Sequence, residues 1–218
     1  CASGSVAGAR GMAEEILRVS SLRKSFEGFE AIPGFGARGD ELRAQRRVAE
    51  LQQRRAVVQR DARALWECLM LESFQAGLSW ITILRRREGF RAAFQGFRPE
   101  IIATWGDAEI ARLLADPGII RHRGKIEATL AGAKAFQRIE AREGFSAFVW
   151  AHVNHEPQQN RPASLADLPT HSETAVALSR SLKAEGFKFV GPTITYAFMQ
   201  AAGLVNDHVA DCYRHGQS

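Results

Sequence analysis

The stretch from Gly186 to Thr193 combines residue types that could hold a phosphate group. It reads Gly-Phe-Lys-Phe-Val-Gly-Pro-Thr and joins two segments with helical patterns. A helix-hairpin-helix turn of this composition points backbone N–H groups at a phosphate, and a glycine lets the phosphate come close. The alternative is a plain helical hairpin that ends at a glycine, and the turn alone does not separate the two.

The segment Val205–Val209, after the second of these helices, is another candidate for chemistry. In helix-hairpin-helix glycosylases a catalytic aspartate stands in this segment just before a His-Val pair. Here Asn206 holds the position of that aspartate, and Asp207 comes one place later. A carboxylate there would activate water or stabilise an oxocarbenium ion, so its absence suggests a substrate whose base already leaves readily.

Four segments, taken in order, resemble the type I 3-methyladenine DNA glycosylase family. They are Glu72–Thr82, Gly118–Ile126, Gly186–Thr193 and Leu204–Val209. The similarity runs nearly without gaps from Leu65 to His208. The resemblance implies a monofunctional hydrolase of base excision repair, which cleaves the N-glycosidic bond of N3-methyladenine and so removes alkylation damage from DNA.

The resemblance assigns the base-binding residues to the first of these segments. Glu72 would be the catalytic carboxylate and would hydrogen-bond to the base, while Trp80 would stack on it. A carboxylate and an aromatic face suit a flat, cationic base that has been flipped out of the duplex. Gln75 and Ser79 are expected on the same helix face as Glu72, because residues three and four apart are neighbours on a helix. By residue type alone, Trp80 would more often be a core residue and Glu72 a surface acid.

Contact with double-stranded DNA is expected at the hairpin and at a local basic cluster. The hairpin residues are Gly186, Lys188, Gly191 and Thr193, and the cluster supplies Arg121, Arg123 and Lys125. The alternative for the cluster is an ordinary solvated face. Overall charge adds little, because residues 1–60 supply four of the five net positive charges (eleven Lys and Arg minus seven Asp and Glu).

His208 and Cys212 correspond to half of a zinc site that the resemblance implies. The family's N-terminal half, a cysteine and a histidine, and its base-contacting tyrosine have no counterpart, because no histidine precedes His122 and no tyrosine precedes Tyr196. Structural zinc almost always has four ligands. We therefore expect zinc to be lost or weakly held, and no cofactor for the chemistry. The missing residues also leave open a catalytically impaired relative that binds DNA or modified bases without excising them.

Residues 1–60 differ from the rest of the chain in their residue pattern and do not resemble the glycosylase family. Residues 12–45 weakly resemble the start of an ABC-transporter ATPase, but no phosphate-binding loop follows, so no nucleotide cofactor is expected. One account is a fused or frameshifted gene whose glycosylase domain spans 61–218. The other is a real arm that contacts DNA through arginines, namely Arg43, Arg46, Arg47, Arg54 and Arg55. Part of this segment could be an exposed helix or disordered.

The pattern from Asp61 onward predicts an all-α helix-hairpin-helix domain. Helices are expected at 62–80, 81–94, 99–105, 108–114, 123–143, 145–152, from Ser172 or Thr174 to 185, and 193–202. Asp107 is expected to cap the fourth of them, Gly89 to weaken the second, and 153–169 to form a loop.

Composition sets further bounds on the chain. With 45% hydrophobic and 24% charged residues, it is an ordinary globular protein without an apolar run that could span a membrane. The chain has three cysteines that lie far apart in the sequence, Cys1, Cys68 and Cys212. This number and spacing favour a reducing cytoplasm over a disulfide framework. A monomer is expected.

Overall fold

The structure is a computed structural model that describes residues 58–162 and 167–208. These residues all belong to Leu42–Ser218, the second of two units into which the chain divides. The expectations for the N-terminal segment up to residue 57, and for Cys212, lie outside the described residues. Among the helices described, none is long and apolar enough to cross a membrane.

The described part is helical, as the sequence predicts. The helices are α3 (Ala62–Gln75), α4 (Trp80–Arg85), α5 (Arg87–Ala93), α6 (Pro99–Ile102), α7 (Asp107–Ala115), α8 (Arg123–Arg142), α9 (Phe145–Trp150), the short 3-10 helix η2 (Ala151–Val153), α10 (Glu173–Ala184) and α11 (Pro192–Ala201). The expected loop over 153–169 also contains β1 (Gln158–Gln159), which pairs in parallel with β2 (Val205–Asn206). Two residues per strand give no recognisable alternation in the sequence, so this pair was not predicted.

The expected single helix over 62–80 is wrong, because the helix ends after Gln75. Ala76 leaves the helical conformation, with φ −47° and ψ 115°. Gly77 has φ +77°, a left-handed conformation that glycine adopts without steric cost. The expected helix over 81–94 is also divided, since Arg86 has φ −103° and ψ 4° between α4 and α5.

Side-chain caps fix several of the helix starts. The carboxylate of Asp61 accepts a hydrogen bond from the backbone N–H of Ala64, and Ser172 caps α10 through Ala175 in the same way. The expected cap at Asp107 is wrong. Gly106 holds that position, and its N–H donates to the side chain of Glu109.

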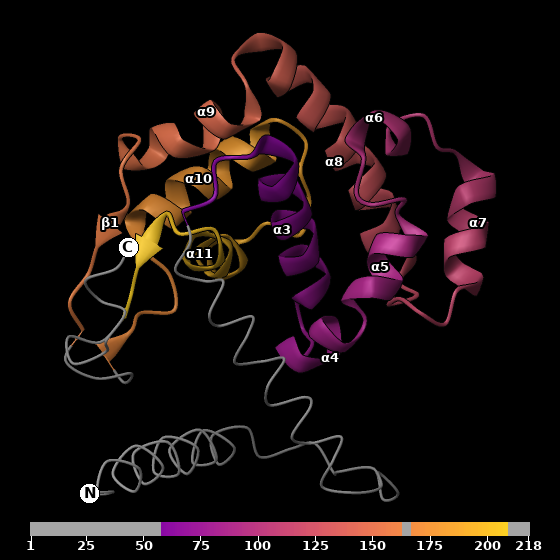
Figure 1. The fold of residues 1–218 in the computed structure, drawn as a ribbon, viewed down its shortest axis with the longest axis horizontal. Helices are drawn as coiled ribbons and strands as arrows, with labels where there is room; N and C mark the ends of the chain where they lie inside the picture. The colour runs from indigo at the N-terminus through magenta and orange to yellow at the C-terminus, as the bar shows by residue number, and fades with distance from the viewer. Residues whose placement is uncertain (1–57, 163–166, 209–218) are drawn as a thin grey trace, which may run out of the picture. The chain divides into compact units, whose positions relative to one another are not determined.

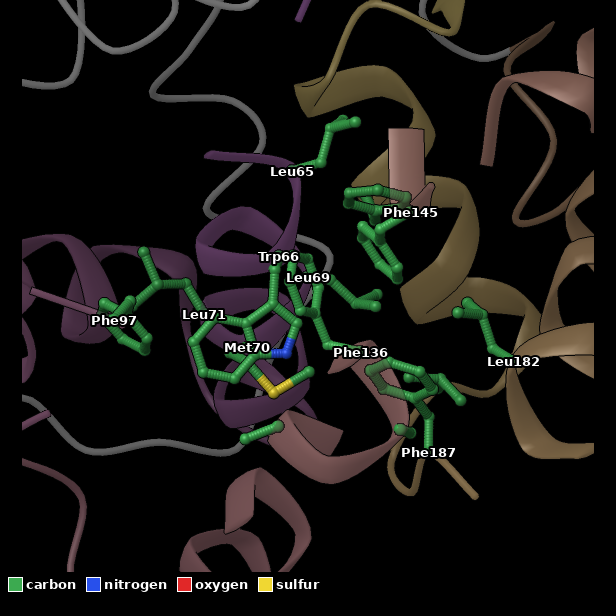
Figure 2. Packing of buried hydrophobic residues seen from close by; sticks show 14 of the residues in the cluster. Leu65, Trp66, Leu69, Met70, Leu71, Phe97, Phe136, Phe145, Leu182 and Phe187 are labelled. Atoms are coloured by element: carbon green, nitrogen blue, oxygen red, sulfur yellow. The ribbon is translucent and has the colours of Figure 1, made fainter. Parts of the chain in front are cut away.

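Helix α3 lies at the centre of the described part. It packs against α11, α8, α9 and α4, and Figure 1 shows it between α10 and α11 on one side and α5, α6 and α7 on the other. Its apolar side chains, among them Leu65, Trp66 and Leu69, are fully buried. Figure 2 shows them in one cluster with Phe136 and Phe187, side chains from α8 and from the turn after α10. The residues at the end of α3 are therefore held from several sides.

Gly89 in α5 allows a close approach between two backbones. A Cβ atom at this position would lie 2.5 Å from the carbonyl oxygen of Gly118. Gly118 begins the segment that leads into α8, so the approach sets where that segment lies on α5. The sequence marks Gly89 as a weak point of its helix, and the structure gives the packing reason for a glycine there.

We predict that Gly89→Ala destabilises the fold. Helix propensity alone would favour alanine by about 1 kcal/mol. Overpacking against the Gly118 carbonyl should outweigh this gain, because such clashes cost about 1–3 kcal/mol. Urea unfolding measures the difference. Ala92→Gly, at an exposed site of the same helix, is the control and should lose about 1 kcal/mol through propensity. A more stable Gly89→Ala protein would contradict the close approach.

Candidate nucleic-acid interface and base pocket

Glu72 is a buried carboxylate close to the C-terminal end of α3. Its exposed fraction is 2%, and Leu71, Ser73 and Phe74 beside it are buried as well. A carboxylate is costly to bury away from water, and functional sites are where proteins carry that cost. Burial excludes the alternative interpretation of Glu72 as an exposed surface residue, although burial alone does not identify its ligand.

The turn between α3 and α4 places the other predicted base-binding residues. Gln75 is the last residue of α3, three positions after Glu72, whereas Ser79 lies beyond the end of α3 and does not share a helix face with Glu72 as expected. The side-chain amide of Gln75 donates to the carbonyl oxygen of Leu78 at 2.6 Å and closes the turn. Ser79 is the N-cap residue of α4, and its hydroxyl lies 2.7 Å from that of Thr82. Both residues shape the turn.

Trp80 is the first residue of α4. Its side chain lies outside the described part of the structure, so its position relative to Glu72 stays a prediction. The backbone shows that only the short turn over residues 76–79 separates Trp80 from the end of α3.

The basic cluster before α8 divides into exposed and buried cations. Arg121 and Arg123 are exposed. Lys125 is 6% exposed, and its ammonium donates to the carbonyl oxygens of Phe74 at 2.8 Å and Ala76 at 2.6 Å. Burial lowers the pKa of Lys125. The expected DNA contact by Lys125 is therefore corrected, because its charge faces the end of α3 rather than the surface.

The hairpin between α10 and α11 is held from behind by two hydroxyl groups. Ser179 donates to the carbonyl oxygen of Val190 at 2.6 Å, and Thr195 donates to the same oxygen at 3.1 Å. In a trans peptide the C=O and the following N–H point in opposite directions. The N–H of Gly191 is thus directed away from the buried hydroxyls, as a phosphate anchor requires. Ser179 lies outside the hairpin motif, and no signal in the sequence identifies it.

The surface of the hairpin carries the predicted DNA-contact residues. Gly186, Lys188 and Thr193 are exposed, and Gly191 is half-buried. Phe189 is 39% exposed and has φ +57°, which is strained for a bulky residue. Such strain is found mainly where surrounding contacts and function maintain it.

The ring of Phe189 joins the hairpin to the start of α8. It lies edge-on to the ring of His122, with centroids 6.0 Å apart, and 5.9 Å from the ammonium of Lys125. His122 itself caps α8, because its Nδ1 accepts the backbone N–H of Lys125 at 3.2 Å. The hairpin and the Arg121–Arg123 segment are therefore parts of one surface.

Both carboxylate oxygens of Asp207 accept hydrogen bonds from other side chains. One oxygen accepts from the hydroxyl of Tyr196 at 2.7 Å and the amide of Gln200 at 2.6 Å, and the other from the amide of Asn160 at 2.6 Å. Burial and the neighbouring Asp207 raise the pKa of Tyr196. Tyr196 is a core residue, and Asp207 ties α11 to the β1–β2 pair.

Asn206, at the position of the usual catalytic aspartate, is also used structurally. It is buried, its side-chain Nδ2 donates to the side-chain oxygen of Gln159 at 2.8 Å, and its side-chain Oδ1 accepts from the backbone N–H of His208 at 3.1 Å. Within the residues that the structure describes, no group of three or more His, Cys, Asp or Glu side chains could hold a metal ion.

A helical domain with a buried carboxylate at one helix end and a glycine-containing hairpin beside a basic surface is typical of DNA-repair glycosylases with a helix-hairpin-helix. Residues 51–215 match the family model described as Methyladenine glycosylase. The chain belongs to the methyladenine glycosylase family.

Named relatives agree with this assignment. The chain is 50% identical over 157 residues to DNA-3-methyladenine glycosylase 1 of Escherichia coli K12, which covers 72% of this chain and 84% of that protein. A crystal structure of 3-methyladenine DNA glycosylase I is 49% identical, with a TM-score of 0.71 over 72% of this chain and 87% of that one. A Staphylococcus aureus structure, described as showing the basis of 3-methyladenine recognition, is 40% identical with a TM-score of 0.71 over 73% and 86% of the two chains.

We predict that Tyr196→Phe lowers the free energy of unfolding by about 1.5–3 kcal/mol at neutral pH, the usual value of a hydrogen bond to a charged group. The raised pKa means that the folded protein keeps the Tyr196 proton while the unfolded chain loses it near pH 10. Tyr196 therefore loses its contribution as the pH rises above about 10. The difference between wild type and variant in urea unfolding should shrink there, and a constant difference would contradict the assignment.

Proposed function

We propose that this chain hydrolyses the N-glycosidic bond of N3-methylated adenine in double-stranded DNA. The observation that carries the proposal is the buried carboxylate of Glu72, one helical turn before the turn that leads to Trp80. In a member of the methyladenine glycosylase family, a buried negative charge at this place suits a base that is itself positively charged.

Hydrolysis of this N-glycosidic bond requires little from the protein beyond binding the extruded base. An N3-methylated adenine is a cation, so it leaves as a neutral base when it takes the electron pair of the N-glycosidic bond. Water adds to the sugar carbon and loses a proton. Glu72 would bind the extruded base and Trp80 would stack on it. Asp207 is not assigned to water activation, because its oxygens accept hydrogen bonds from Tyr196, Gln200 and Asn160.

The DNA backbone would be held by the hairpin and the surface beside it. The N–H of Gly191, directed away from Ser179 and Thr195, would donate to a phosphate at the N-terminus of α11. Arg121, Arg123 and Lys188 are exposed around it and would add charge. The chain would act as a monomer in a reducing cytoplasm.

A second candidate is a protein of the same family that binds DNA or modified bases without excising them. It is favoured by the absence of a tyrosine before Tyr196 and of a histidine before His122. The experiment that separates the two is release of 3-methyladenine from methylated duplex DNA by the purified full chain. If the wild-type protein releases 3-methyladenine and the Glu72→Gln variant does not, the proposed glycosylase activity is supported. Binding of methylated DNA without release supports the second candidate.

We predict that Trp80→Ala weakens binding of free 3-methyladenine while leaving the fold intact. Removing one base–aromatic stack costs about 1–3 kcal/mol, or roughly 5- to 150-fold in affinity. Calorimetric titration of the base measures the loss, and Trp105→Phe, a change at a buried tryptophan outside the turn residues 76–79, is the control. Equal affinity in wild type and Trp80→Ala would remove Trp80 from the pocket.

We predict that Gly191→Val weakens DNA binding but not binding of the free base. A Cβ at Gly191 meets no atom within 4 Å, so the fold has room for the side chain. Its methyl groups would stand where a phosphate must approach the backbone N–H. Fluorescence anisotropy with an undamaged duplex measures the DNA affinity. Parallel loss of base binding and of the unfolding transition would mean that the substitution acts through the fold instead.

We also propose that the family zinc is lost or weakly held, because four ligands are the rule for structural zinc and the chain offers His208 and Cys212. Metal analysis after dialysis against a mild chelator should therefore find less than one equivalent. A full equivalent that is lost in His208→Ala would contradict this and would require further ligands from elsewhere in the chain.

A further inference from the structure

The buried ammonium of Lys125 is placed against the end of the helix that carries Glu72. Lys125 lies in the first turn of α8, and the carbonyl oxygens that it contacts belong to Phe74, in the last turn of α3, and to Ala76, the residue that caps it. These partners are 51 and 49 positions away in the sequence. The lysine is therefore a cap for α3 that comes from a different helix.

Electrostatics explains why a charged group occupies this place. The last carbonyl groups of an α-helix have no partner within the helix, and the helix dipole gives that end a partial negative charge. Lys125 satisfies two of these oxygens with a charge-assisted hydrogen bond each. Burying an ammonium group costs desolvation free energy. The two hydrogen bonds of Lys125 must offset this cost.

The turn that Lys125 holds sets the direction from Glu72 to Trp80. Residues 76–79 connect α3 to α4 and reverse the chain through Gly77, whose φ is +77°. Gln75 closes the turn from one side through Leu78, and Lys125 fixes its first residue from the other. The two contacts together leave little freedom in where α4 begins.

We propose that Lys125 is a positioning residue for the base pocket, which it acts on by fixing the end of α3 and the turn before α4. The inference rests on the proposed function of Glu72 and Trp80. Lys125 also lies beside the DNA-contact surface, because the ring of Phe189 on the hairpin is 5.9 Å from its ammonium. The same charge thus borders the hairpin and the turn before Trp80.

The test compares Lys125→Met with Lys134→Met in the full chain. Methionine matches the lysine stem in length and lacks the charge, and Lys134 is an exposed lysine of the same helix. We expect the single-turnover rate of excision at saturating methylated DNA to fall about tenfold to hundredfold in Lys125→Met, as a displacement of roughly 1 Å at a reacting group does. Affinity for undamaged duplex should stay unchanged. The Lys134→Met protein should match wild type in both measurements.

Hydrogen exchange supplies a readout that needs no activity. The backbone amides of Gly77, Leu78 and Ser79 should exchange faster in Lys125→Met and at the wild-type rate in Lys134→Met. If wild type releases no 3-methyladenine, the proposed function fails, and faster exchange of this turn would still support the positioning of the turn by Lys125. Unchanged exchange overturns the inference whatever the activity.

Other outcomes also decide the inference. An unchanged excision rate overturns it, and so does a fall in rate and DNA affinity in parallel, which would mark a direct DNA contact or a role in overall stability. Should Lys125→Met fail to fold, Lys125→Gln takes its place, because the amide keeps a donor but is too short to reach both carbonyls. A wild-type rate in folded Lys125→Gln would overturn the inference.

Discussion

The enclosure of α3 by other helices is the constraint on which the rest of the structure depends. Leu65, Trp66 and Leu69 fill the core, and α11, α8, α9 and α4 pack around the helix. A shift of a helix that is packed on several sides is costly, because protein interiors are close-packed. Its C-terminal end, which carries Glu72, is therefore presented in one fixed place, as preorganised electrostatic stabilisation requires.

Polar groups from distant parts of the chain hold three places in the described fold. Lys125 satisfies the end of α3, Ser179 fixes the Val190 carbonyl behind the hairpin, and Asp207 joins α11 to the β1–β2 pair. Each is a buried or half-buried polar group with hydrogen-bond partners, which is the state that burial demands. In each case the contact orients a neighbouring backbone segment or helix.

This arrangement explains how a glycosylase site can lack the usual aspartate after the hairpin. Asn206 and Asp207 hold strands and helices together, and the proposed function gives the contact with the base to Glu72 on α3 instead. A cationic base leaves with little help, and holding it in a buried, negatively charged place suffices for the proposed chemistry.

The sequence by itself determined the features that depend on near neighbours along the chain. Helix periodicity and the hairpin at Gly186–Thr193 follow from contacts a few residues apart, and four motifs in order identified the family. Only the tertiary structure decided that Lys125 faces the end of α3 instead of DNA, and that Gly89 must admit the backbone of Gly118. Those contacts join residues 29 to 51 positions apart. A local sequence pattern does not show which of many possible partners the packing brings into contact.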